Sequence, residues 1–199
     1  MDYRGDIFYI EQVLSGKVNA FTHIVGKHKD RVFNLAFRIC GNHEEAEEVA
    51  QDAFLKAYRS LKSFRMKSSF STWLYRIVYN TAISSVRARK KGLLSLEDFP
   101  ADATDFIGSN PGEEDAEREY RDSLINFALQ KVSDEERGLI SLFYYEEMST
   151  DEISEVTGIS KANVKVKLFR ARQKLYEIIQ REEKKKTLLY ETQIITKRK

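Results

Sequence analysis

The chain has 199 residues, of which 42% are hydrophobic and 32% are charged, and its formal net charge is only +2. This composition is typical of a globular protein with one domain or two small ones, and the overall charge alone gives no indication of nucleic-acid binding. The distribution of charge says more: basic residues gather at 87–91 and again from 161 to 186, whereas residues 92–117 contain no lysine or arginine.

A single cysteine, Cys40, excludes an intrachain disulfide and favours a reducing compartment. The three histidines, His23, His28 and His43, have no ligand-like spacing, so we expect solvated histidines, no metal site and no cofactor. No apolar run approaches the length of a membrane span, and the first ten residues are too short in their apolar part for a secretory signal. We therefore expect a cytoplasmic protein with no membrane insertion of its own.

Two helices are predicted at the start of the chain. Residues 7–14 form a short amphipathic pattern that ends at Ser15. Asn19 is expected to cap a longer helix that ends at Gly41. The buried side of this longer helix is predicted to contain Phe21, Ile24, Val25, Val32, Leu35, Ala36 and Ile39.

The third predicted helix, residues 43–61, has an apolar stripe on one side and carboxylates beside it. The stripe consists of Ala46, Val49, Ala50, Ala53, Phe54, Ala57 and Leu61. The first two carboxylates complement the helix dipole and need no functional explanation. Glu48, Gln51 and Asp52 lie a turn or more inside the helix, where the dipole effect has faded. They are interpreted either as a solvated face or as a docking surface.

Residues 64–91 combine a polar loop with a long helix that Ser69 or Ser71 can cap. The predicted buried face of this helix is Phe70, Trp73, Leu74, Ile77 and Thr81. The neighbouring face carries cations and an amide, which suit phosphates and exposed base edges, while aromatic rings can stack on bases. An aromatic stripe is usually core, so the hypothesis of nucleic-acid contact depends on the remaining residues. These candidates are Phe64, Arg65, Lys67, Ser68, Arg76, Asn80, Arg87 and Arg89.

Residues 92–112 predict a boundary between two domains. They hold both prolines of the chain, Pro100 and Pro111, and alternate acidic with apolar residues without a helical period. We expect a flexible acidic linker that is either disordered alone or lies along a partner.

Helical patterns resume from residue 113, and Ser133 and Ser149 each begin a capping box. Gly158 then permits a tight turn between two short helices, which predicts a helix-turn-helix. Many such units are only packing corners, but here a basic face falls on the second helix, which favours duplex DNA. The candidate DNA-binding residues are Ser160, Lys161, Asn163, Lys165, Lys167, Arg170 and Arg172.

Three blocks of the sequence resemble the extracytoplasmic-function (ECF) sigma factors of bacterial RNA polymerase. They are AEEVAQDAFLKAY (46–58), FSTWLYRIVYNTAISSVR (70–87) and STDEISEVTGISKANVKVKLFRARQKL (149–175). The resemblance implies an all-α fold of two small helical domains joined by the flexible acidic linker, the second containing the helix-turn-helix. The implied domains are residues 1–91 and 113–180, with a linker at 92–112. A tail at 181–199 runs past the usual end of the family.

The resemblance also implies an alternative sigma factor that binds core RNA polymerase and directs promoter recognition and opening, without enzymatic activity of its own. Glu48, Gln51 and Asp52 would dock on the clamp helices of the β′ subunit, and the β subunit would be a further partner. The candidates of residues 64–89 would read the minus-ten element of promoter DNA as an opened strand. Those of residues 160–172 would read the minus-thirty-five element as duplex. An anti-sigma factor is an expected further partner.

Two other interpretations are open from the residues alone. A stand-alone helix-turn-helix regulator would explain the second domain, but it leaves the polar face around Asn80 and the acidic linker unexplained. A small nuclease would need paired carboxylates with metal-ligand spacing or a usable histidine, and the sequence shows neither.

Overall fold

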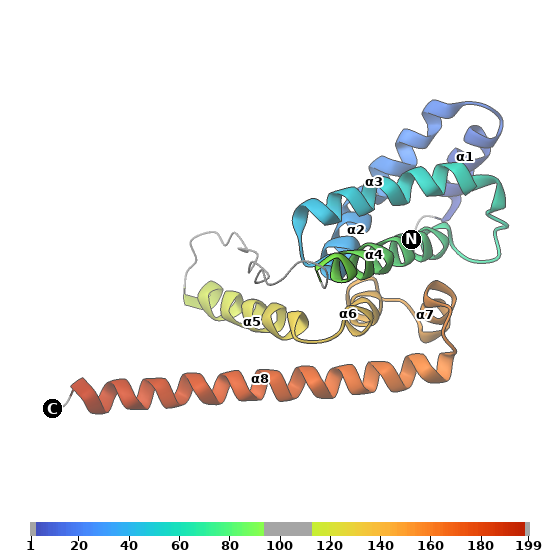
Figure 1. Ribbon diagram of the computed structural model, residues 1–199. Coiled ribbons are helices and arrows are strands. Elements are labelled where there is room, and N and C mark those ends of the chain that lie inside the picture. The colour runs from blue at the N-terminus through green and yellow to red at the C-terminus, as the bar shows by residue number, and fades with distance from the viewer. Residues whose placement is uncertain (1–2, 94–112, 198–199) are drawn as a thin grey trace.

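The computed structural model describes residues 3–93 and 113–197 of the chain. All regular elements within these two ranges are helical, so the predicted all-α fold is confirmed there (Figure 1). The predicted linker falls largely on residues 94–112, which lie outside the described residues. The helices are α1 (Tyr3–Leu14), α2 (Phe21–Cys40), α3 (His43–Ser60), α4 (Phe70–Leu93), α5 (Glu113–Gln130), α6 (Asp134–Ile140), α7 (Thr150–Thr157) and α8 (Lys161–Lys197).

Helices α1 to α4 form a first unit, in which α2, α3 and α4 enclose a common core. Short side chains of α3, among them Ala46, Ala53 and Ala57, are fully buried and allow the neighbouring helices to approach closely. Leu35 of α2 and Leu74 of α4 are fully buried in the same core. The apolar stripe predicted for the third helix is therefore confirmed.

Histidine 28 lies in this unit as a buried group, contrary to the solvated position expected for it. His28 Nε2 lies 3.1 Å from Oδ1 of Asp6 in α1, and Lys27 Nζ lies 2.8 Å from the same oxygen. Burial lowers the pKa of His28, although the hydrogen bond to Asp6 opposes the shift. The expectation of a solvated His28 is wrong because α1 folds back over α2 and covers the ring.

Helix α4 is buried over a wider arc than its sequence predicts. Trp73 and Ile77, from the predicted buried face, remain half-buried. Tyr75 and Tyr79 are buried instead, because the second unit covers that side of the helix. The buried arc of α4 therefore faces two neighbours rather than one.

Several helix ends follow local sequence signals. Helix α2 ends at Gly41, whose φ of 70° is left-handed and favours glycine. Asn42 then caps α3, because its side chain accepts a hydrogen bond of 2.8 Å from the amide of Glu45. Of the two caps considered for α4, Ser69 is the one used: its Oγ accepts a hydrogen bond of 2.9 Å from the amide of Thr72.

The start of α2 differs from its prediction. Asn19 lies inside a short 3-10 turn, Val18–Ala20, that runs directly into α2. Ala20 has helical dihedral angles, φ −64° and ψ −20°, and no side-chain cap is present there. The predicted cap at Asn19 is therefore wrong, because the preceding turn already continues the helical path of the chain.

Helices α5 to α8 form a second unit with both predicted capping boxes. The amides of Glu136 and Glu152 donate to the hydroxyls of Ser133 and Ser149, and each Glu side chain accepts from the amide of its serine. Gly158 ends α7 with φ 75°, and the helix-turn-helix of α7 and α8 is confirmed. Helix α8 does not end near residue 180 but continues to Lys197, with α5 packed along it (Figure 1).

The two units are docked on each other, with α7 against α4 and α6 against α2 (Figure 1). A single π-helical turn, Ser141–Tyr145, continues α6 and also contacts α2. Within the described ranges, no helix is both long and apolar enough to cross a lipid bilayer.

Replacing Ser149 with alanine should lower the free energy of unfolding by about 1 kcal/mol, because the first turn of α7 loses its capping box. Urea denaturation followed by circular dichroism measures this change. Ser84→Ala, on the exposed side of α4, is the matched control and should stay within about 0.5 kcal/mol of the parent. Equal losses for both variants would contradict a role of the cap.

Candidate nucleic-acid interface

The loop at 65–69 lies beside a cluster of three aromatic rings. The ring centroids of Phe64 and Phe70 lie 5.5 Å apart, and Trp73 lies 5.4 Å from Phe64 and 5.6 Å from Phe70. Phe64 is only 9% exposed, so its ring belongs to the core and is not open to a base. The sequence analysis expected Phe64 to be accessible, because it lies outside the predicted buried face of the helix. In the structure, Phe70 and Trp73 cover its ring.

The loop itself presents polar side chains around this cluster. Arg65 and Lys67 are exposed and Ser68 is half-exposed. Met66 has φ 54°, a left-handed conformation that is uncommon for a residue with a side chain, and it is 48% exposed. Such strain clusters at binding sites. The loop can therefore meet a ligand with two cations and a hydroxyl.

Helix α4 carries the predicted polar stripe on its exposed side. Arg76, Asn80 and Arg87 are all exposed, as their spacing indicates. Arg87 Nη2 donates a hydrogen bond of 2.8 Å to Oε1 of Glu135 in α6. Arg89 is bound within the first unit, to the carboxylate of Glu45 and, at 3.2 Å, to the backbone carbonyl of residue 40. Arg76 and Asn80 are thus the members of the stripe best placed to meet a ligand.

The acidic side of α3 is a separate exposed surface. Glu48, Gln51 and Asp52 are exposed, and Asp52 lies 2.7 Å from Nζ of Lys56. Leu55 lies among them and is 53% exposed, although sequence reasoning did not single it out. The sequence does indicate it: Leu55 is an apolar residue outside the buried stripe, four positions from Gln51 and three from Asp52. A single exposed leucine is ordinary on a protein surface, but polar groups around it make it a candidate apolar centre for an interface.

Helix α8 presents the predicted basic face. Lys165, Arg170 and Arg172 are exposed, and none of the described carboxylates lies within ion-pair distance of them. Two predicted residues are paired: Lys161 lies 2.6 Å from Asp151, and Lys167 lies 3.0 Å from Glu135. Ser160 caps the helix through a long contact of 3.4 Å from the amide of Asn163.

The same face of α8 contains two apolar residues that sequence reasoning missed. Val166 and Phe169 are 46% and 56% exposed. They lie three positions apart and outside the buried stripe of Val164, Leu168 and Ala171. Exposed apolar side chains on a basic recognition helix suit the methyl group of thymine in the major groove.

The first turn of α6 places two carboxylates, Glu135 and Glu136, next to cations of α4 and α8. Hydrogen bonds from Lys167 and Arg87 lower the pKa of Glu135, against a smaller opposing effect of burial. Burial raises the pKa of Glu136, but hydrogen bonds from Lys174 and Ser133 outweigh it, so the net pKa is lowered. Both carboxylates are therefore ionised near neutral pH.

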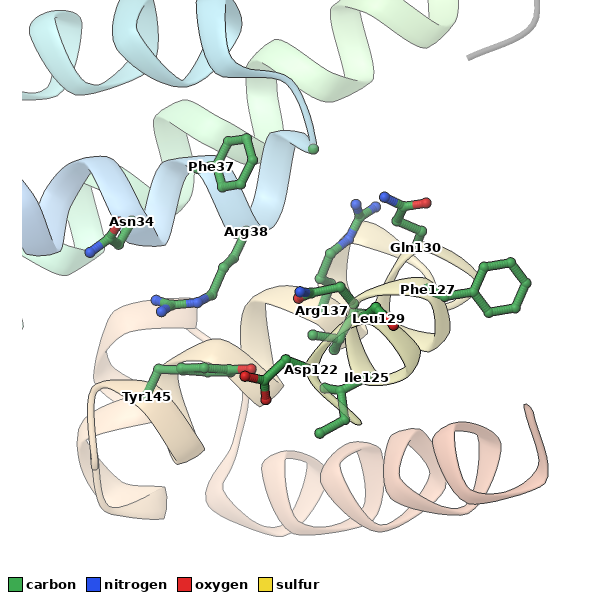
Figure 2. Close-up of a pocket in the computed structure, with 13 residues that line it drawn as sticks. Asn34, Phe37, Arg38, Asp122, Ile125, Phe127, Leu129, Gln130, Arg137 and Tyr145 are labelled. Atoms are coloured by element: carbon green, nitrogen blue, oxygen red, sulfur yellow. The ribbon is translucent and has the colours of Figure 1, made fainter. Parts of the chain in front are cut away.

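A cleft of about 580 Å³ lies between α2 and α5, where the two units meet (Figure 2). Arg38 extends from α2 toward the second unit, and its guanidinium carbon lies 3.8 Å from the ring centroid of Tyr145 (Figure 2). None of the residues predicted to bind DNA or polymerase lines this cleft. Among the described residues, no group of three or more potential ligands is placed to hold a metal ion.

Comparison with known proteins matches both units. A model of sigma-70 region 2 matches residues 24–92, and a model of sigma-70 region 4 matches residues 123–175. The chain is 35% identical to the ECF RNA polymerase sigma factor SigW of Bacillus subtilis, over 83% of this chain and 92% of that protein. It is 31% identical to the RNA polymerase sigma-H factor of Pseudomonas aeruginosa, over 86% of this chain and 92% of that protein.

A solved structure shares the fold. The sigma factor RpoE of Bartonella quintana, crystallised with the anti-sigma factor NepR, matches with a TM-score of 0.68 at 22% identity. The match covers 80% of this chain and 96% of that one.

Phe64→Ala should lower the free energy of unfolding by about 3–5 kcal/mol, because the ring is packed against Phe70 and Trp73. Phe64→Leu fills most of the same space and should cost less than about 1.5 kcal/mol. Urea denaturation measures both variants. If Phe64→Ala unfolds like the parent, the ring is not part of the core and its assignment as a base-stacking group regains support.

Proposed function

This chain belongs to the extracytoplasmic-function sigma factors of bacterial RNA polymerase, and on this premise we propose how its surfaces direct promoter recognition and opening. The observation that carries the proposal is the presence, in one chain, of an exposed polar stripe on α4 and a basic recognition helix in α8. A stand-alone regulator needs only the second surface. The proposed domains are residues 1–91 and 113–180, with a linker at 92–112 and a tail at 181–199.

The exposed side of α3 is the proposed docking surface for the clamp helices of the β′ subunit. Leu55 supplies an apolar centre, and Glu48, Gln51 and Asp52 supply a polar rim. This arrangement matches the general anatomy of protein interfaces, in which a desolvated centre gives affinity and charges give orientation. The β subunit would be contacted elsewhere, and the chemistry of RNA synthesis would belong to the polymerase.

The loop at 65–69 and the stripe on α4 are the proposed site for the opened minus-ten strand. Asn80 offers a donor and an acceptor to the edge of an unpaired base. Arg65, Lys67 and Arg76 can neutralise phosphates, and Ser68 can donate a hydrogen bond to them. Phe64 is buried against Phe70 and Trp73, so it would hold the loop in place and not contact a base. Arg87 and Arg89 would extend the phosphate contacts once they leave their carboxylate partners.

The outer face of α8 is the proposed site for minus-thirty-five duplex. Ser160, Lys161, Asn163 and Lys165 lie in the first turns, where a recognition helix meets base edges. Val166 and Phe169 would contact thymine methyl groups. The cations farther along, Lys167, Arg170 and Arg172, would hold phosphates.

The proposal includes a cytoplasmic location, where polymerase acts, and restraint by an anti-sigma factor. The latter rests on the similar fold of the Bartonella sigma factor that was crystallised with such a partner. The proposed function requires no cofactor bound to this chain.

The proposed function is tested by adding the purified chain to core RNA polymerase and sequencing the transcripts made from genomic DNA. Transcripts that begin at a defined set of promoters only when the chain is present would support it. A stand-alone regulator would bind duplex DNA but would neither co-purify with core polymerase nor change where transcription starts.

Reversing the charge of Glu48 and Asp52 to lysine should weaken binding to core polymerase at least tenfold and leave the unfolding midpoint unchanged. Both side chains are exposed, so their loss costs little stability, whereas reversed charges at a docking surface repel the partner. The matched control reverses Glu11 and Asp30, which are exposed on α1 and α2. Equal co-purification of the two double variants would remove α3 from the docking surface.

Arg170→Ala should weaken binding to promoter duplex and lower the slope of log affinity against log salt concentration by about one unit. Fluorescence anisotropy over a salt series measures the slope. Arg181→Ala, an exposed arginine farther along α8, serves as the control and should leave the slope unchanged. A parental slope for Arg170→Ala would mean that Arg170 does not contact a phosphate.

A further inference from the structure

Helix α1 packs against both elements between which the loop at 65–69 runs. It contacts the 3-10 turn Leu61–Ser63, which precedes Phe64 and the loop, and it contacts helix α4, which follows the loop. Ile10 of α1 is fully buried and belongs to the same core as the inner residues of α2, α3 and α4. None of the residues proposed to bind DNA or polymerase lies in α1, so its contacts with these elements have no role in the function proposed so far.

A buried polar contact joins α1 to α2. Asp6 of α1 and His28 of α2 are both buried, and Oδ1 of Asp6 lies 3.1 Å from Nε2 of His28. Nζ of Lys27 lies 2.8 Å from the same oxygen. Because burial lowers the pKa of His28, its ring is neutral near pH 7, and Nε2–H donates the hydrogen bond to Asp6. This hydrogen bond fixes how the imidazole ring is turned.

The oriented ring of His28 contacts the aromatic cluster beside the loop. Its centroid lies 5.5 Å from that of Phe70, at an interplanar angle of 62°, which is an edge-to-face contact. Phe70 is itself buried, and it also contacts the rings of Phe64 and Trp73. Phe64 immediately precedes the loop and Phe70 immediately follows it. The positions of these two rings therefore determine where both ends of the loop lie.

The pair of Asp6 and His28 is a costly way to fill this space if it only holds helices together. A buried carboxylate and a buried imidazole both lose their hydration, and apolar side chains of similar volume often give equal or higher stability at such places. A hydrogen bond adds direction to packing, because it favours one orientation of the donor and the acceptor. Here the ring that it orients lies against Phe70.

We propose that Asp6 and His28 are positioning residues, which hold the loop at 65–69 in the geometry that binds the opened minus-ten strand. The inference rests on the proposed function, because it concerns the site assigned to that strand. Both residues are buried, so they act through Phe70 and not by touching DNA. The left-handed conformation of Met66 fits this role, since an uncommon conformation persists only where the surrounding structure determines it.

Asp6→Ala and His28→Leu test the proposal, because each removes the hydrogen bond while leucine fills most of the space of the imidazole. The probe is a single-stranded oligonucleotide with the non-template minus-ten sequence of a promoter that the chain uses, added to the complex of the chain with core polymerase. Each variant should bind this strand about tenfold more weakly, the loss expected for one base contact. Binding to core polymerase, which uses another surface of the same unit, should stay parental. Glu11→Ala, at an exposed acidic position of α1, is the matched control and should match the parent in both measurements.

Asp6→Asn distinguishes positioning from charge, because the amide keeps an oxygen that accepts from Nε2 of His28. It should bind the strand like the parent. Trp73 is the single tryptophan of the chain and lies 5.6 Å from Phe70, so its fluorescence reports directly on the aromatic cluster. The emission maximum of the chain alone should shift in Asp6→Ala but not in Asp6→Asn or Glu11→Ala.

Three results would overturn the proposal. Asp6→Ala and His28→Leu could bind the strand like the parent, or Asp6→Asn could bind it as weakly as Asp6→Ala. Binding of strand and polymerase could also fall together, which would mean that the pair only keeps the first unit folded. If the parent complex does not bind the strand at all, the proposed function fails, and the emission of Trp73 then decides separately: a shift in Asp6→Ala supports positioning of the cluster, and no shift overturns it.

Discussion

The burial of α4 on two sides is the constraint on which the rest of the structure depends. Leu74 and Val78 face the core that α2 and α3 complete, while Tyr75 and Tyr79 face the second unit. Burial raises the pKa of Tyr79 to about 12, so its hydroxyl stays protonated in the cell. Only one strip of the helix remains for solvent. The exposed polar stripe on α4 is thus defined by what its two neighbours leave uncovered.

Features governed by contacts within a few residues could be predicted from the sequence. The capping boxes at Ser133 and Ser149 involve partners three positions away, and the turn at Gly158 depends on the backbone freedom of one residue. The order of helices and the basic side of α8 follow from apolar periodicity in the same way. Asn19 shows the limit of this reasoning, because the turn before a helix decides whether a cap is needed.

The features that escaped prediction depend on partners far away in the sequence. Glu135, the partner of Arg87, lies 48 residues away, so no local pattern indicates that these charges are paired. Phe64 is buried by rings whose orientation depends on how the loop closes. In the sequence, Gly138 indicates only a residue that destabilises its helix. The structure shows that the ring of Tyr79 packs directly against it. Sequence reasoning therefore predicted which surfaces bind partners, but it could not show which of their cations are paired within the chain.

Two kinds of interaction hold the junction of the two units, and they respond to different agents. Exposed ion pairs such as Arg87–Glu135 contribute about 0–1 kcal/mol each and weaken as salt rises. The packing of Gly138 on Tyr79 and the buried bond from Tyr75 to Glu146 contain no group that a phosphate can replace. The junction therefore keeps its packed contacts at salt concentrations that weaken its ion pairs.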